Sequence, residues 1–187
     1  MLELFKQLDY TTFHYINGLW RHEVADVIFT FFRKPSNWIP LYVLLLGYTI
    51  SKYRWNFWRV LICVALTVGT ADAVSSHIVK NAFKRARPCN QPELVGKVVN
   101  IVPCGSGYSF TSSHAANHFA LAAALSMTLF RRKKYVQTAF FIWAGCVAYA
   151  QVYCGVHFLF DVISGALLGL AIAFLLITLI YPRILQH

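Results

Sequence analysis

The stretch SSHAANHFALAAALSMTLF, residues 112–130, decides the fold. It is an apolar run of near-spanning length that opens with two hydroxyls and a histidine. A helix needs about 20 residues at 1.5 Å per residue to cross a bilayer. Four other apolar segments have spanning or near-spanning length, and they cover residues 38–51, 57–79, 136–153 and 158–180. The sequence therefore predicts an all-α integral membrane protein, a bundle of about five transmembrane helices.

The composition supports a bilayer environment. Hydrophobic residues make up 58% of the 187 residues and charged residues only 13%, a balance that is unusual for a soluble domain. Residues 1–35 alternate apolar and polar positions, which predicts amphipathic helices that lie on the membrane surface. No linker or internal repeat divides the chain. We therefore expect one domain, with interfacial helices at 1–35 and a transmembrane part at 36–187.

The net charge of +10 indicates membrane topology rather than nucleic-acid binding. Lys52, Arg54 and Arg59 follow the first apolar segment, and the run 131–134 (RRKK) follows the third. These alternate loops fall on one side of the membrane, and the positive-inside rule makes that side cytoplasmic. The loop 80–110 and the turn 153–157 then face outward, and the C-terminus, with Arg183, returns to the cytoplasm.

Two of the five cysteines, Cys89 and Cys104, lie in the long outer loop. An oxidising compartment would allow a disulfide between them. Such a bridge would close a loop of about 15 residues and contribute about 3 kcal/mol in the chain-entropy description. Metal binding is the weaker alternative, because no other soft ligand is close in sequence.

Two polar clusters border the outer ends of the apolar segments. Lys80 and Arg87 are seven residues apart, so on one helix they would share a face, with Pro88 ending that helix. Alone, this pattern is typical of basic side chains reaching toward lipid headgroups. Ser112 and Ser113 are cap-type residues at a helix start, where free N–H groups and the helix dipole favour an anion.

A third cluster contains His157 and Asp161, which are four residues apart and meet on one helical face. The carboxylate can accept a hydrogen bond from Nδ1 and leave the Nε2 lone pair free, which prepares the imidazole as a nucleophile or base. Most isolated His–Asp pairs are only structural. Here, however, the expected topology brings all three clusters, including His114, to one membrane face. Cations, a helix N-terminus and two histidines together predict a site for a phosphate ester.

The three clusters resemble the type 2 phosphatidic acid phosphatase family, whose motifs are K-x6-R-P, P-S-G-H and S-R-x5-H-x3-D. The matching positions span about residues 80–165. The resemblance implies that His157 attacks phosphorus to form a phosphohistidine, that Asp161 orients it, and that His114 protonates the leaving oxygen and then activates water. It also implies that the phosphoryl oxygens are held by Lys80, Arg87, Ser112, Ser113 and Gln151, without a metal or other cofactor.

The chain departs from these motifs at four positions. Thr111 and Ser113 replace proline and glycine, and both still suit a helix start. Ala150 replaces serine. Gln151 replaces the third-motif arginine, which removes a positive charge and a bidentate donor. Lys84, one helical turn after Lys80, is a candidate to compensate.

The resemblance predicts a lipid phosphatase at the outer face of a bacterial inner membrane. Its substrate would be a lipid phosphate or diphosphate, with undecaprenyl diphosphate favoured by the small size of the chain. Phosphatidylglycerophosphate, phosphatidate and lipid A phosphate are competing substrates. A non-catalytic phospholipid-binding relative is the alternative that Gln151 suggests. A transporter is disfavoured, because the ionisable residues gather at one face rather than midway along the segments.

Overall fold

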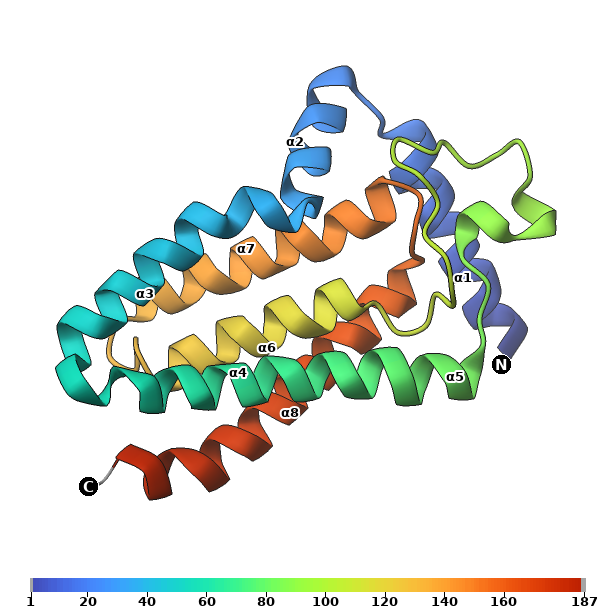
Figure 1. Cartoon of the computed structure of the whole chain (residues 1–187). Helices are drawn as coiled ribbons and strands as arrows, with labels where there is room; N and C mark the ends of the chain where they lie inside the picture. Colours follow the sequence, from blue (N-terminus) through green and yellow to red (C-terminus); the bar gives the residue numbers. More distant parts are fainter. Residues whose placement is uncertain (1, 186–187) are drawn as a thin grey trace.

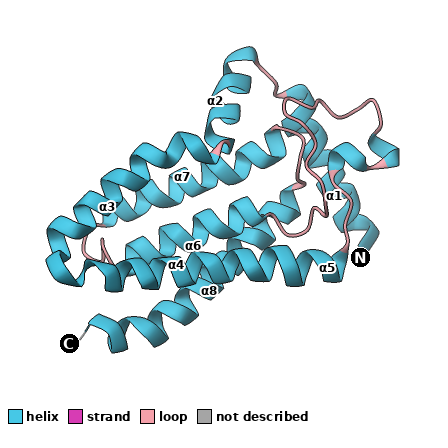
Figure 2. Ribbon diagram, viewed as in Figure 1, coloured by secondary structure: helices cyan, strands magenta, loops and turns pink. Residues whose placement is uncertain are grey.

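The computed structural model describes the backbone of residues 2–185 and the side chains of residues 3–180. Every regular element in this range is a helix, as Figure 2 shows. The long helices are α1 (Leu2–His14), α2 (Glu23–Arg33), α3 (Ile39–Tyr53), α4 (Phe57–Ala73), α6 (Ser113–Met127), α7 (Lys134–Tyr153) and α8 (Leu159–Leu185). A π-helical segment, η4 (Val74–Val79), joins α4 to the short α5 (Lys80–Phe83).

The predicted all-helical fold is confirmed. Helices occupy all five apolar segments, as α3, α4 with η4, α6, α7 and α8. Two helical stretches are long and apolar enough to cross a membrane, Pro35–Leu94 and Leu159–Ile180. Five separate crossings therefore remain a prediction. The expected cytoplasmic C-terminus and the side chain of Arg183 lie outside the described residues.

Helix α6 is the central element of the bundle, and α4, α7 and α8 pack around it (Figure 1). Its buried face consists mainly of alanines, which allow neighbouring backbones to approach closely. Helix α8 uses this space through two glycines four residues apart. A Cβ on Gly165 would lie 2.5 Å from the carbonyl oxygen of Ser112, and a Cβ on Gly169 would overlap the carbonyl oxygen of Ala116. The glycines therefore place the start of α8 directly against the start of α6.

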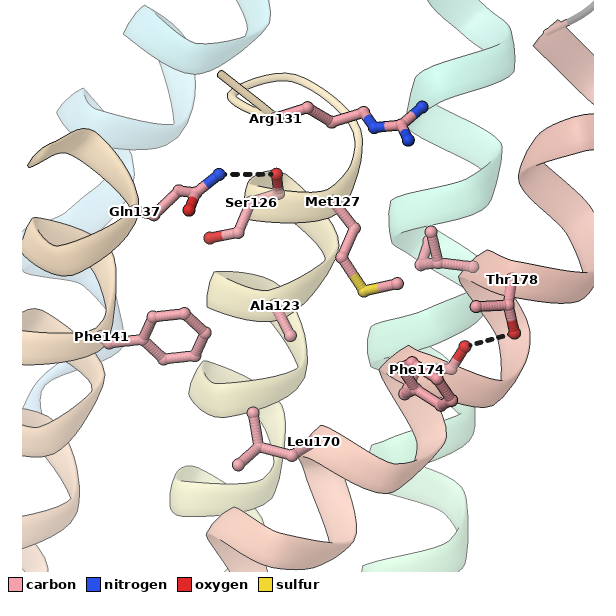
Figure 3. Close-up of a pocket in the computed structure, with 10 residues that line it drawn as sticks. Ala123, Ser126, Met127, Arg131, Gln137, Phe141, Leu170, Phe174 and Thr178 are labelled. Carbon is pink, nitrogen blue, oxygen red and sulfur yellow. Dashed lines mark hydrogen bonds between the residues drawn. The ribbon is translucent and has the colours of Figure 1, made fainter. Parts of the chain in front are cut away.

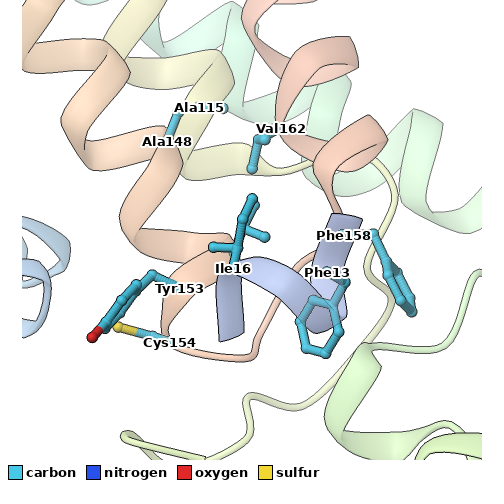
Figure 4. Close-up of a cluster of buried hydrophobic side chains, with 9 residues drawn as sticks. Phe13, Ile16, Ala115, Ala148, Tyr153, Cys154, Phe158 and Val162 are labelled. Carbon is cyan, nitrogen blue, oxygen red and sulfur yellow. The ribbon is translucent and has the colours of Figure 1, made fainter. Parts of the chain in front are cut away.

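The N-terminal segment closes one end of the bundle. Figure 1 shows α1 lying across the ends of the long helices, on the side where α6 and α8 begin. The rings of Phe13 and Phe158 are 5.4 Å apart, and Ile16 is 4% exposed. These side chains share a core with residues of α6, α7 and α8 (Figure 4). The interfacial placement of residues 1–35 stays a prediction, but α1 is clearly packed on the end that carries the polar clusters.

The loop from residue 84 to residue 112 also covers this end. Cys89 and Cys104 are joined by a disulfide, with Cα atoms 6.0 Å apart. One detail of the sequence interpretation is wrong: Lys80 and Arg87 do not share a helix. Helix α5 ends at Phe83, because Lys84 adopts the left-handed conformation with φ 47°, and Arg87 lies in extended chain. The approach of Arg87 to the site is therefore set by loop geometry rather than by helical periodicity.

Candidate active site

The start of α6 forms one wall of the site. The Ser112 hydroxyl accepts a hydrogen bond from the backbone N–H of Ala115 at 3.4 Å, and the Ser112 N–H donates to the Asp161 carbonyl oxygen at 2.9 Å. The first bond is the predicted N-cap. The second joins the second and third motifs directly. The hydroxyl of Ser113 lies 2.9 Å from that of Ser76 and 3.1 Å from that of Ser75, so the π-helical segment steadies this wall.

His157 lies in the turn between α7 and α8, and its side chain is 3% exposed. Nη1 of Arg87 is 3.2 Å from its Nε2. A guanidinium carries only donors, so Nε2 must be the acceptor and the imidazole proton must sit on Nδ1. That atom lies 3.5 Å from Oδ2 of Asp161 and 3.4 Å from the Ser109 hydroxyl. Burial lowers the pKa of His157, which favours the neutral ring. The geometry is that of an oriented, unprotonated Nε2.

Asp161 is fully buried and held from several sides. Its carboxylate accepts hydrogen bonds from the Phe158 N–H at 2.9 Å, from the Ser109 hydroxyl and from Nη1 of Arg85 at 2.7 Å. A buried carboxylate with this many donors remains ionised and fixed in place. Ser109 and Arg85 were not singled out from the sequence, since neither belongs to a spaced motif with Asp161.

Arg85 connects the Asp161 carboxylate to the N-terminal helix. Its Nη2 donates to Oδ2 of Asp9 at 2.6 Å, and its guanidinium lies 4.1 Å from the ring centre of Phe158. Asp9 is 1% exposed and also accepts from the Phe160 N–H at 3.0 Å. Burial raises the pKa of Asp9, and the bonds from Phe160 and Arg85 oppose that rise. An Asp9–Arg85–Asp161 chain therefore positions the third motif. No local sequence pattern joins these three residues.

His114 lies one residue inside α6 and borders a cavity of about 320 Å³. Tyr42, Val68 and Leu121 give this cavity apolar walls, and Ser113, Asn117 and His118 give it polar ones. The charges of Lys80 and His157 lie within electrostatic range of His114. Lys80 is half-buried and interacts at longer range with Arg87 and Asp161. The structure therefore brings Lys80, Arg87, His114, His157 and Asp161 together at one end of the bundle.

Gln151 is placed differently from the other predicted phosphate ligands. Its side chain is buried, and its amide donates to the Val147 carbonyl oxygen of its own helix at 3.3 Å. The exposed Lys84 points to no role in the site either, because its left-handed backbone takes it off the helix that carries Lys80. Among the described residues, no three His, Cys, Asp or Glu side chains gather as a metal ligand set.

A larger cavity lies elsewhere. It measures about 770 Å³ and is enclosed by α6, α7 and α8 near Ser126, Met127 and Arg131, as Figure 3 shows. Ser126 and Met127 are the last two residues of α6 and Arg131 follows it, whereas His114 is at its start. The helix has 15 residues, so the two places are about 20 Å apart. This cavity therefore takes no part in the arrangement around His157.

Comparisons with known proteins identify the arrangement. The chain is similar to a lipid A 4'-phosphatase of Bacteroides thetaiotaomicron, with 30% identity over 175 residues, covering 90% of this chain and 75% of the relative. It is also similar to an undecaprenyl-diphosphatase of Sulfolobus acidocaldarius, with 29% identity over 174 residues, covering 93% of this chain and 75% of the relative. Among solved structures, Aquifex aeolicus LpxE superposes with a TM-score of 0.69 and 26% identity, covering 91% of this chain and 95% of that one.

The family assignment rests on the part of the chain that builds the site. The PAP2 superfamily profile matches residues 56–185, which include all three motifs and the helices that carry them. The resemblance inferred from the spacing of Lys80, His114 and His157 is thereby confirmed. The chain belongs to the PAP2 superfamily of membrane phosphatases.

Proposed function

We propose that this protein hydrolyses a lipid phosphate through a phosphohistidine formed on Nε2 of His157. The observation that carries the proposal is the geometry around this ring. Asp161 and Ser109 face Nδ1, and the donor Arg87 faces Nε2. The lone pair of Nε2 is thus directed at a cation that can hold a phosphoryl group. An arriving phosphate offers Arg87 a charged acceptor and releases Nε2 for attack.

The reaction has two displacements at phosphorus. In the first, Nε2 forms a bond to phosphorus while the bond from phosphorus to the lipid oxygen breaks, and that oxygen takes a proton from His114. In the second, water gives a proton to His114 and attacks phosphorus, and the N–P bond breaks. Orthophosphate leaves and His157 is regenerated. Catalysis of this kind depends on in-line positioning and charge stabilisation, and the clustered donors of this site supply both.

Three groups of donors are suited to hold the phosphoryl oxygens. Arg87 is 9% exposed and Lys80 is half-buried, so their charges act in a medium of reduced dielectric. The free N–H groups at the start of α6, around Ser113 and His114, add the positive end of a helix dipole. The predicted roles of Ser112 and Gln151 as direct ligands have less support, since both side chains are engaged in their own helices.

Two lipid substrates stand out. Lipid A phosphate is favoured by the similarity to lipid A 4'-phosphatases of two species, each about 30% identical over most of this chain. Undecaprenyl diphosphate is favoured by the similarity to an undecaprenyl-diphosphatase. Both present a phosphoryl group at the membrane surface, where the cavity beside His114 opens between α3, α4 and α6.

We place the site at the outer face of a bacterial inner membrane. The disulfide between Cys89 and Cys104 lies at the site end of the bundle and suits an oxidising compartment. The exposed basic run 131–134 lies at the other end and suits the cytoplasmic side. A thiol-alkylation shift assay on cells, with and without reductant, tests this orientation: alkylation of Cys89 and Cys104 without reductant would contradict it.

Orthophosphate release from a panel of lipids in detergent tests the function. The panel holds lipid A, undecaprenyl diphosphate, phosphatidylglycerophosphate and phosphatidate, each offered to the wild type and to His157→Ala. We expect release from at least one lipid by the wild type and none above background by the variant. Full activity of the variant would contradict the nucleophile. Lipid binding without release by the wild type would instead indicate a non-catalytic relative.

A further inference from the structure

The proposed phosphate site lacks one positive charge that the third motif of the family would supply. The third motif of the family carries an arginine where this chain has Gln151, and the Gln151 amide is turned toward Val147. Lys84, the cation that follows Lys80 in sequence, is exposed and does not lie on the helix of Lys80. A cation that replaces the motif arginine must therefore come from another element that packs on this end of α7.

Helix α2 is that element. It runs antiparallel to α7. Asp26 accepts a hydrogen bond from the Tyr153 hydroxyl at 2.7 Å, whereas the ring of Trp38, beyond the end of α2, packs edge-on against Trp143 with centroids 5.3 Å apart. Between these points, the Phe29 ring lies 4.8 Å from that of Tyr149. Arg33, the last residue of α2, is one turn after Phe29 and therefore on the same face.

The end of α2 also reaches the cavity of the site. Pro35, two residues after Arg33, lines the same cavity as His114. The charge of Arg33 lies within electrostatic range of both Arg87 and His114. Arg33 therefore lies near the cavity that His114 borders, on an element that is 118 residues away from Gln151 in sequence (151 minus 33).

Among the side chains of residues 3–180, none forms a hydrogen bond or ion pair with Arg33. Arg33 is half-buried, and its Nε is buried without a hydrogen-bond partner. An unpaired cation removed from water is unfavourable, and its repulsion with Arg87 adds to the cost. An anion held between the two guanidiniums would relieve both effects. A phosphoryl group is the anion that this site is built to take.

We propose that Arg33 is a phosphate ligand that replaces, from α2, the missing arginine of the third motif. The proposal rests on the proposed function for its substrate. It also accounts for how a chain with a neutral residue at position 151 can retain a full set of phosphate donors. Bidentate contact with two equatorial oxygens is the mode that a guanidinium provides.

The test compares Arg33→Ala with Lys34→Ala, which removes the adjacent but exposed cation. Each is assayed for kcat/KM on the lipid that the wild type hydrolyses and for the inhibition constant of inorganic phosphate. We expect Arg33→Ala to lower kcat/KM by about 10- to 100-fold and to weaken phosphate inhibition by a similar factor. Lys34→Ala should change both by less than about twofold.

The double variant Arg33→Ala/Gln151→Arg gives the decisive arm. A guanidinium at position 151 should raise kcat/KM and strengthen phosphate inhibition, each by at least about tenfold relative to Arg33→Ala. Wild-type phosphate inhibition in Arg33→Ala, or no recovery in the double variant, would overturn the proposal. If the wild type hydrolyses no lipid, the proposed function fails instead. Calorimetric binding of inorganic phosphate to the same four proteins then decides the role of Arg33 by itself.

Discussion

The two ends of the bundle both carry several cations, but they use them differently. At the end where α6 finishes, Arg131, Arg132, Lys133 and Lys134 are all exposed. At the end where α6 begins, Arg87 is 9% exposed and contacts His157, and Arg85 bridges two buried carboxylates. The first set is contiguous in sequence. The second set draws its partners from separate segments, because His157 and Asp161 follow α7 and Asp9 lies on α1.

The difference teaches how to weigh charge in a membrane protein. Exposed basic residues at a helix end need only water or lipid headgroups around them, and they set topology. A cation withdrawn from water must be compensated by anions or acceptors that converge on it. The buried cations therefore mark the site, although the exposed ones contribute equally to the net charge of +10.

Arg87→Ala should give the largest contrast between the two ends. The change removes the donor that faces Nε2 of His157, which is also a proposed phosphate ligand, so kcat should fall by about 10²–10³-fold. Arg132→Ala, at the opposite end, should stay within about twofold of wild type. Steady-state orthophosphate release measures both. Equal losses in the two variants would show that net charge, rather than the local arrangement, drives activity.

Gly165→Ala tests whether the close approach of α8 to α6 matters to the site end. The added methyl group would lie 2.5 Å from the Ser112 carbonyl oxygen, so the start of α6 must shift. We expect a loss of about 1–3 kcal/mol in stability and about 10-fold or more in kcat. Gly145→Ala on α7 is the matched control, because no atom lies within 4 Å of its new Cβ. Thermal melting and turnover are measured together; an unaffected Gly165→Ala would refute the tight packing.

Asp9→Asn should have a smaller effect on catalysis. The change removes the charge of one of the two carboxylates that hold Arg85. Arg85 then fixes Asp161 less firmly, although Asp161 itself is unchanged. We expect kcat to fall by about tenfold, with KM nearly unchanged. Arg21→Ala breaks the more exposed ion pair between Arg21 and Asp26, and it should lower stability by at most about 1 kcal/mol and leave kcat unchanged. A rise in KM alone for Asp9→Asn would place Asp9 in substrate binding instead.

Much of the fold, and the proximity of His157 to Asp161, could be predicted from sequence because their signals are local. Apolar runs of near-spanning length located the helices. His157 and Asp161 share a helical face by spacing alone, and Ser112 marks a helix start. These patterns need no knowledge of tertiary structure.

The remaining parts of the site depend on contacts between distant segments. Asp9 and Arg85 are 76 residues apart, and so are Arg85 and Asp161, so no local pattern joins them. The shared helix for Lys80 and Arg87 was predicted wrongly because one left-handed residue, Lys84, ended it early. Gly165 and Gly169 did carry a signal, since small residues four apart in an apolar helix indicate close helix packing.

Capture of the covalent intermediate tests the role of His157 most directly. Wild-type protein and His157→Ala are mixed with lipid labelled with ³²P on its phosphoryl group, quenched with alkali within the first turnover and digested. We predict a base-stable, acid-labile label on the peptide that contains residue 157 in the wild type, and no label in the variant. A label that survives a parallel acid quench but not alkali, or an equal label in both proteins, would contradict the account.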